Sequence, residues 1–100
     1  MTAQEFFASL PERADASKIA GMQNTFVFDV QDVGQWTVSV EDGTVSVTEG
    51  VGEADCTISA TDETLVKIAK GEANPTTAYM TGKLKIQGDM GAALKLQKLF

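Results

Sequence analysis

The sequence predicts an α+β fold of two layers, in which a five-stranded, mainly antiparallel sheet is covered on one face by helices. Two observations lead to this fold. Five segments alternate apolar and polar residues with a period of two, and helix-like segments precede, separate and follow them. The apolar residues of all five segments can share one face, so only that face needs a covering layer. With 100 residues, the chain is expected to form one stand-alone domain over residues 1–100.

The first expected element is a helix over residues 2–10. Two adjacent phenylalanines and Leu10 lie at helical spacing. Thr2 and Glu5 match a capping box, in which the hydroxyl and the carboxylate each accept a hydrogen bond from the backbone N–H of the other residue. Pro11 is expected to end this helix or to begin another.

Three strands are then expected to form an antiparallel meander. Asp42 and Gly43 separate the second strand from the third, and this dipeptide is typical of a hairpin turn because both residues tolerate positive φ. Val33 and Gly34 hold the corresponding place between the first strand and the second. The three strands cover residues 25–31, 35–41 and 44–49.

The second half of the chain alternates strands with helices. Thr61 or Asp62 can cap a helix that Gly71 ends, and Asn74 can cap a short helix that begins with proline. Asp89 can cap the last helix. The expected elements are a strand over 55–60, helices over 62–70 and 74–80, a strand over 83–87 and a helix over 90–99.

The last helix is apolar nearly all round its circumference. A helix with a single apolar stripe needs one covering layer, whereas this one needs burial on two sides. The second side can be covered by a partner subunit, a ligand cavity between helix and sheet, or a membrane surface; alternatively, the last residues simply fold back onto the core. The apolar residues are Met90, Ala92, Ala93, Leu94, Leu96, Leu99 and Phe100.

The sequence offers no catalytic residue, metal site or cofactor site. It contains no histidine, and its one cysteine, Cys56, falls on the apolar face of a strand, where a small core residue is expected. The glycines from Gly82 to Gly91 match neither the dinucleotide-binding nor the P-loop spacing. Asp89 would itself occupy the anion-binding position of the last helix. A non-enzymatic protein is therefore expected.

The net charge of −6 disfavours a nucleic-acid partner. The charge is uneven, because six lysines stand against two acids from Lys67 onwards. This part of the chain is expected to have at most a transient contact with a membrane surface. No apolar run of about 18 residues and no secretory signal pattern are present, which leads us to expect a cytoplasmic protein.

The second half of the chain, residues 55–100, resembles the sterol carrier protein type-two domain, a sterol-binding and lipid-transfer module. The order and spacing of the family's motifs agree over these 46 residues. The matching positions are Asp62-Glu63, Gly71, Asn74-Pro75, Ala78-Tyr79-Met80, Gly82 to Ile86, Gly88 to Met90 and Lys95-Leu96.

The resemblance implies an apolar tunnel between the layers that holds a fatty acyl chain, an acyl-CoA or a sterol-like lipid. It also implies carriage of that lipid without catalysis and without a cofactor. The alternative is an interaction module with a filled core, in which Leu96, Leu99 and Phe100 form a homodimer or partner interface. The residues expected to line the tunnel are Phe28, Trp36, Val38, Leu65, Ile68, Met80, Leu84, Ile86, Met90, Leu94 and Leu96.

Overall fold

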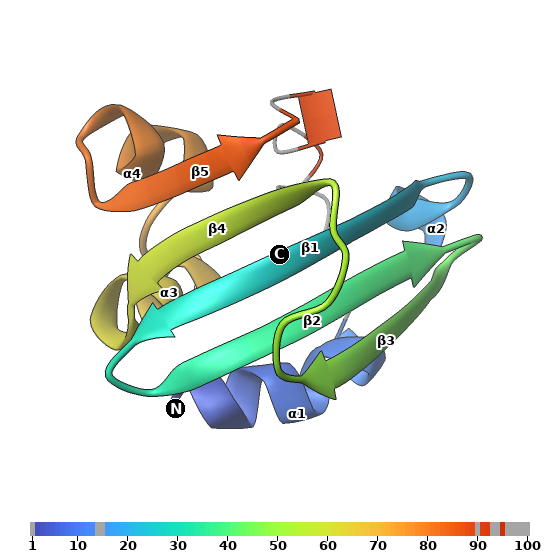
Figure 1. The fold of residues 1–100 in the computed structure, drawn as a ribbon, viewed down its shortest axis with the longest axis horizontal. Coiled ribbons are helices and arrows are strands. Elements are labelled where there is room, and N and C mark those ends of the chain that lie inside the picture. The colour runs from blue at the N-terminus through green and yellow to red at the C-terminus, as the bar shows by residue number, and fades with distance from the viewer. Residues whose placement is uncertain (1, 14–15, 90, 93–94, 96–100) are drawn as a thin grey trace.

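A mixed five-stranded sheet forms one layer of the structure, and helices form the other (Figure 1). The computed structural model describes residues 2–13, 16–89, 91–92 and 95. Its elements, in chain order, are α1 (Ala3–Arg13), α2 (Ala16–Ile19), β1 (Gln23–Gln31), β2 (Gly34–Glu41), β3 (Thr44–Glu49), β4 (Cys56–Thr61), α3 (Asp62–Ala69), α4 (Pro75–Met80) and β5 (Leu84–Gly88).

The strand order is β3-β2-β1-β4-β5. The first three strands form the expected meander, since β1 pairs antiparallel with β2 and β2 with β3. The fourth strand lies parallel to β1 on its other side, and β5 pairs antiparallel with β4. Three of the four pairings are therefore antiparallel, which confirms the expected fold class.

The helix ends use the capping residues that the sequence predicts. The Thr2 N–H donates to Glu5 Oε1 at 3.1 Å, and the Glu5 N–H donates to Thr2 Oγ1 at 3.2 Å. Thr61 caps α3, and Asn74 caps α4. After β5, the Asp89 carboxylate accepts from the Gly91 N–H at 2.8 Å, which is the hydrogen bond expected of a residue that caps a following helix. Of the expected final helix, residues 90, 93–94 and 96–99 lie outside the described residues.

Two features of the N-terminal region differ from the expectation. The helix α1 continues through Pro11 to Arg13, and the short helix α2 follows it. A proline inside a helix removes the hydrogen bond to the carbonyl four residues earlier. Because Pro11 lies near the end of α1, the loss concerns only the last turn, and Leu10 stays buried in the core.

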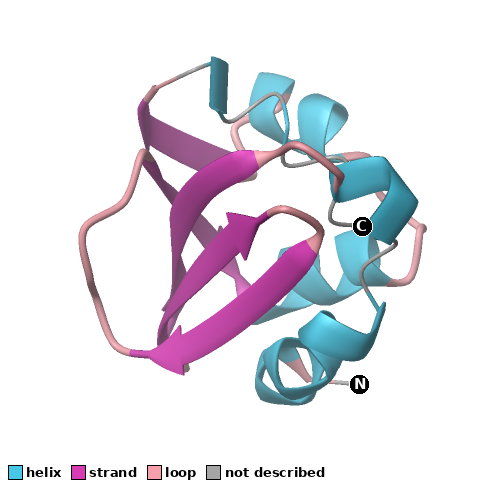
Figure 2. Cartoon of the chain, turned by 90° about the vertical axis from the view of Figure 1, so that its right-hand side faces the viewer, coloured by secondary structure: helices cyan, strands magenta, loops and turns pink. Residues whose placement is uncertain are grey.

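The core lies between the sheet and the helices, and Figure 2 shows the helices on one side of the sheet only. The connection from β3 to β4 crosses the opposite face (Figure 2). This connection is tied to the sheet where Thr37 Oγ1 donates to the Gly50 carbonyl at 2.8 Å. Val27, which faces away from the helices, is buried as well, and its register partners there are Thr37 and Thr57.

Helix α1 covers the sheet through aromatic contacts. The ring of Phe7 stacks on Trp36 with centroids 4.6 Å apart, and it lies 5.2 Å from the ring of Phe28. At the start of the helix, the Ala3 N–H donates to Asp62 Oδ1 at 2.8 Å. The carboxylate of α3's first turn therefore holds the N-terminus of α1 in place.

Gly88 ends β5 at a point where the backbone of the neighbouring strand is very close. Its φ is +110°, and a Cβ placed there would lie 2.6 Å from the Asp55 carbonyl oxygen. Asp55 cannot easily move away. Its N–H donates to the Thr25 carbonyl at 2.8 Å, and its carbonyl accepts from the Asp89 N–H at 2.9 Å.

Gly88→Ala should therefore lower the free energy of unfolding by about 2–3 kcal/mol, because it adds a steric clash to an unfavourable φ. Gly82→Ala is the matched control. Gly82 has a φ of +79°, but a Cβ placed there would meet no atom within 4 Å, so only the conformational cost, about 1 kcal/mol, is expected. Urea denaturation measures both values. Equal losses in the two variants would contradict the proposed role of the Asp55 contact.

Candidate functional site

Six of the residues expected to line a tunnel lie together in the core. They come from both layers of the structure, and all are buried. Three belong to β1 and β2, two to α3 and one to β5. The six are Phe28, Trp36, Val38, Leu65, Ile68 and Leu84.

The part of the core beneath α1 is filled by aromatic rings. Phe28 and Trp36 contact Phe7, as described above, and Phe7 in turn lies 5.3 Å from the ring of Phe6. The sequence pattern places Phe7 on the buried face of a helix, but it carries no signal for which strand that helix covers. The contact between Phe7 and two of the expected lining residues was therefore not predicted.

The part of the core around β4, β5 and α3 is covered less completely. Ile86 on β5 and three alanines pack against the core but remain partly exposed, whereas among the described residues the α1 side has one such residue, Val47 on β3. Ile86 stands directly opposite Ile58 in the β4–β5 register. Ala92, just after β5, is buried in the same core cluster, so the chain that follows β5 returns to this side of the sheet. The three alanines are Ala60, Ala69 and Ala73.

The candidate apolar site is the region next to β4, β5, α3 and Ala92, where the buried and half-buried lining residues expected in the second half of the chain gather. Beside the large buried side chains of Leu65, Ile68 and Leu84, three alanines pack there, and alanine fills less volume than an aromatic ring. Three further residues of the expected lining, Met90, Leu94 and Leu96, lie outside the described residues.

Met80 does not take an enclosed position. Its side chain is 79% exposed, whereas Ala78, two positions earlier, is the buried residue of α4. Two positions correspond to about 200° around a helix, so the two side chains point in nearly opposite directions. The family motif placed Met80 in the lining, but helix geometry puts its side chain on the surface.

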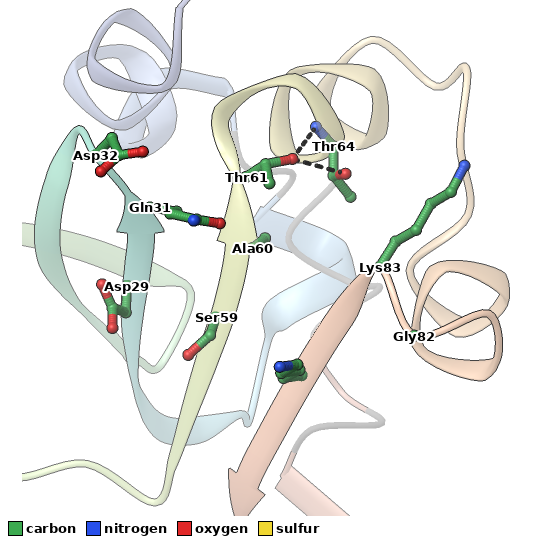
Figure 3. Close-up of a pocket in the computed structure, with 10 residues that line it drawn as sticks. Asp29, Gln31, Asp32, Ser59, Ala60, Thr61, Thr64, Gly82 and Lys83 are labelled. Carbon is green, nitrogen blue, oxygen red and sulfur yellow. Dashed lines mark hydrogen bonds between the residues drawn. The ribbon is translucent and has the colours of Figure 1, made fainter.

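A groove of about 620 Å³ lies on the opposite face of the same strands (Figure 3). Asp29 and Ser59 are register partners there, and Lys85 pairs with Ser59 on the other side. At one end, Thr61 Oγ1 accepts from the Thr64 N–H at 3.2 Å. Most residues that line this groove carry a hydroxyl, amide or charged group, so an acyl chain bound there would displace water from polar groups.

Cys56 is the only thiol of the chain, and it is buried next to two carboxylates. Burial, together with the negative charges of Asp55 and Asp89, raises the pKa of this thiol from 9.0 to about 11. At neutral pH the group is therefore an uncharged thiol, which is a poor nucleophile.

The Cys56 pKa predicts slow alkylation of the native protein. At pH 8, a pKa of about 11 instead of 9.0 lowers the thiolate fraction about 100-fold. Labelling with iodoacetamide should be slower by at least this factor than in urea, and it should accelerate about tenfold per pH unit above pH 8. Equal labelling rates for native and unfolded protein would contradict this environment for Cys56.

The described part of the chain holds neither a metal site nor a membrane span. No three side chains from His, Cys, Asp and Glu there gather into a group that could hold a metal ion. None of its helices is long and apolar enough to cross a membrane.

Comparison with known proteins connects this geometry with one family. The sequence profile of the SCP-2 sterol transfer family matches residues 3–100. Sterol carrier protein 2 from Bos taurus is 43% identical over an alignment of 88 positions that covers 82% of this chain and 16% of that protein. The chain therefore spans only a small part of the length of this curated relative.

Two solved structures share the fold over nearly the whole chain. The sterol carrier protein domain 2 of Helicoverpa armigera superimposes with a TM-score of 0.77 at 31% identity, covering 95% of this chain and 82% of that one. The inverting sec-alkylsulfatase Pisa1 from Pseudomonas sp. gives a TM-score of 0.86 at 26% identity. It covers all of this chain, which corresponds to 16% of the sulfatase. The fold therefore occurs both as a small domain and as part of a much longer enzyme.

Proposed function

This chain belongs to the SCP-2 sterol transfer family, and on that premise we propose that it binds and carries an apolar lipid without converting it. The proposed ligand is a fatty acyl chain, an acyl-CoA or a sterol-like molecule. It lies between the sheet and the C-terminal segment, against β4, β5 and α3. Two of the matched relatives are named sterol carrier proteins, and their names support a lipid cargo.

The observation that carries the proposal is the uneven filling of the core. Aromatic rings occupy the space under α1, whereas Ile86 and three alanines near β4, β5 and α3 are only half-buried. We assign the ligand to the region near β4, β5 and α3. Its proposed walls are Leu65, Ile68, Leu84, Ile86, Met90, Leu94 and Leu96, with Phe28, Trp36 and Val38 forming the sheet side deeper in the core.

The hydrophobic effect supplies enough free energy for such a site. Each buried methylene contributes about 0.8 kcal/mol, so about ten methylenes of an acyl chain contribute about 8 kcal/mol before the cost of association. This hydrophobic contribution to binding requires no polar side chain that contacts the lipid. Met80, at the surface end of α4, is then proposed to contact the ligand only at the opening of the site.

Carriage without catalysis is supported by the chemistry of the chain. The sequence has no histidine, and its one thiol is held in the uncharged form by burial. An acyl ester bound beside β5 would meet apolar side chains rather than an activated nucleophile. We therefore propose that a bound lipid leaves the protein chemically unchanged.

The function is tested with purified protein in two steps. Native mass spectrometry should show a fraction of the protein carrying one co-purified lipid, and extraction with solvent should remove it. The extracted protein should then bind one equivalent of a fluorescent fatty acid that unlabelled palmitate displaces. A protein that carries no lipid and binds no fluorescent fatty acid would overturn the proposal in favour of a filled core.

A further inference from the structure

Strand β3 forms one edge of the sheet, and its outer side is open to a further strand. The strand order places β2 on one side of β3, and no other described strand pairs with it. In an antiparallel pair, every second residue turns its N–H and C=O toward the partner strand, and the residues between turn theirs away. The Gly50 N–H donates to the Gln35 carbonyl at 2.8 Å, which fixes the phase of this alternation. The backbone groups of Val45, Val47 and Glu49 are therefore directed away from β2.

The β3 edge lacks the features that commonly block a sheet edge. Proteins protect such edges with lysine, proline, a bulge or a very short strand. The other edge strand, β5, has five residues, carries Lys85 and ends at Gly88, whose φ is +110°. Strand β3 has six residues, contains neither lysine nor proline, and pairs with β2 in continuous register. Of the two edges, β3 is therefore the one that can accept a further strand.

An apolar cleft of about 310 Å³ lies beside this edge, between β3 and α1 (Figure 1). The rings of Phe7 and Trp36, which are almost fully buried, line it together with Val47 of β3. Ala8 and Pro11 line it from α1, and both are exposed. Ligand pockets typically measure roughly 300–1,000 Å³, so this cleft suits a side chain rather than a whole lipid.

The charges around the β3 edge favour a basic partner. Glu41 and Asp42 immediately precede β3 and its turn, and Glu49 is the last residue of the strand. All three side chains are exposed. Residues 34–49, which form β2, the turn and β3, contain these three acids and no basic residue. Negative charge at both ends of the strand is complementary to a partner with basic side chains.

We propose that the β3 edge and its cleft bind an extended, basic peptide segment of another protein. The segment pairs with β3 as an added strand, through the backbone groups of Val45, Val47 and Glu49. Every second side chain of an added strand faces the helices, so an apolar side chain in that register enters the cleft beside Val47. Basic residues at the two ends of the segment reach the acids at the two ends of β3. This edge lies across the sheet from β5, so the inference does not depend on the proposed lipid site.

Amide hydrogen exchange, followed by NMR, tests the pairing residue by residue. The probe is a short synthetic peptide that alternates threonine with valine and leucine and has an arginine at each end. Saturating peptide should slow exchange at Val45, Val47 and Glu49 roughly tenfold or more, because their N–H groups gain partners. The amides of Ser46 and Thr48 face β2 and should be protected with or without peptide. The same peptide with methylated backbone nitrogens lacks donors for the pairing and should bind roughly tenfold more weakly.

Two pairs of variants test the cleft and the charges, and each pair makes the same kind of change at two places. Ala8→Lys fills the cleft, whereas Thr77→Lys alters an exposed residue of α4, which packs beside β5. Glu49→Lys reverses a charge at the end of β3, whereas Glu72→Lys reverses an exposed charge after α3. Fluorescence anisotropy of the labelled peptide should show about tenfold weaker binding for Ala8→Lys and Glu49→Lys, and less than about twofold for their controls. Circular dichroism establishes that all four variants are folded.

Three results would overturn the proposal. The first is that millimolar peptide leaves exchange at Val45, Val47 and Glu49 unchanged. The second is that the methylated peptide binds as well as the unmodified one, and the third is that both members of a variant pair lose binding equally. If these amides are instead protected in concentrated protein without peptide, and light scattering shows a dimer, a second copy of the chain occupies the edge and the proposal is wrong.

Discussion

Ile86→Glu should lower the affinity for a fatty acid by about 100-fold or more while the protein stays folded. Ile86 lies on the core side of β5, opposite Ile58, and is only half-buried. A glutamate there must either hold its carboxylate against the acyl chain or take up a proton, and both cost several kcal/mol of binding free energy. Fluorescent fatty-acid titration of the extracted protein measures the change.

The control for this variant is the next residue of the same strand. Gln87 is exposed and points to the other face of the sheet, so Gln87→Glu adds the same charge without touching the proposed site. It should change the affinity less than twofold. Circular dichroism and the urea midpoint establish that both variants are folded. If a folded Ile86→Glu protein binds the fatty acid with unchanged affinity, the ligand does not bind on this side of β5.

Phe7→Ala should lower the free energy of unfolding by about 3–5 kcal/mol, because it leaves a cavity among the aromatic rings under α1. The ring is buried and contacts Phe6, Phe28 and Trp36. A loss of this size is a large share of the roughly 5–15 kcal/mol that typically holds a domain together. Urea denaturation followed by the fluorescence of Trp36, the only tryptophan, measures it.

Gln4→Ala is the matched control on the same helix. Gln4 is exposed, so its truncation should change stability by less than about 0.5 kcal/mol. The two variants together show whether α1 is fixed by its apolar face rather than by helix propensity. A Phe7→Ala protein as stable as Gln4→Ala would mean that the rings under α1 are not close-packed.

Much of the fold follows from patterns that extend over a few residues. Alternation along β1, β2 and β3 and the Asp42-Gly43 turn specify the meander, because a strand's faces and a two-residue turn are local properties. The cap at Asn74 is local as well, because it depends only on Asn74 and the first residues of α4. The place of β4 beside β1 is different, because a long connection separates the two strands and no local signal selects the partner.

In the candidate site, too, the direction of a side chain follows from the local pattern, whereas contacts between residues far apart in the sequence do not. Period two predicts that Ile86 faces the core, and the β4–β5 register confirms its direction. The pairing of Phe7 with Trp36 joins residues far apart in the sequence, and facing alone does not predict it. Met80 was expected in the lining because it matches a family motif. On α4, however, its side chain points away from that of Ala78, which is buried, and therefore lies on the surface.

Photolabelling tests the location of the lipid most directly. The extracted protein is irradiated with a fatty acid that carries a diazirine near its methyl end, digested, and sequenced by mass spectrometry. The label should appear in α3, β5 and residues 89–100, and an excess of palmitate should suppress it. Labelling confined to the polar groove around Asp29 and Ser59, or labelling that palmitate does not suppress, would contradict a lipid site between the sheet and the C-terminal segment.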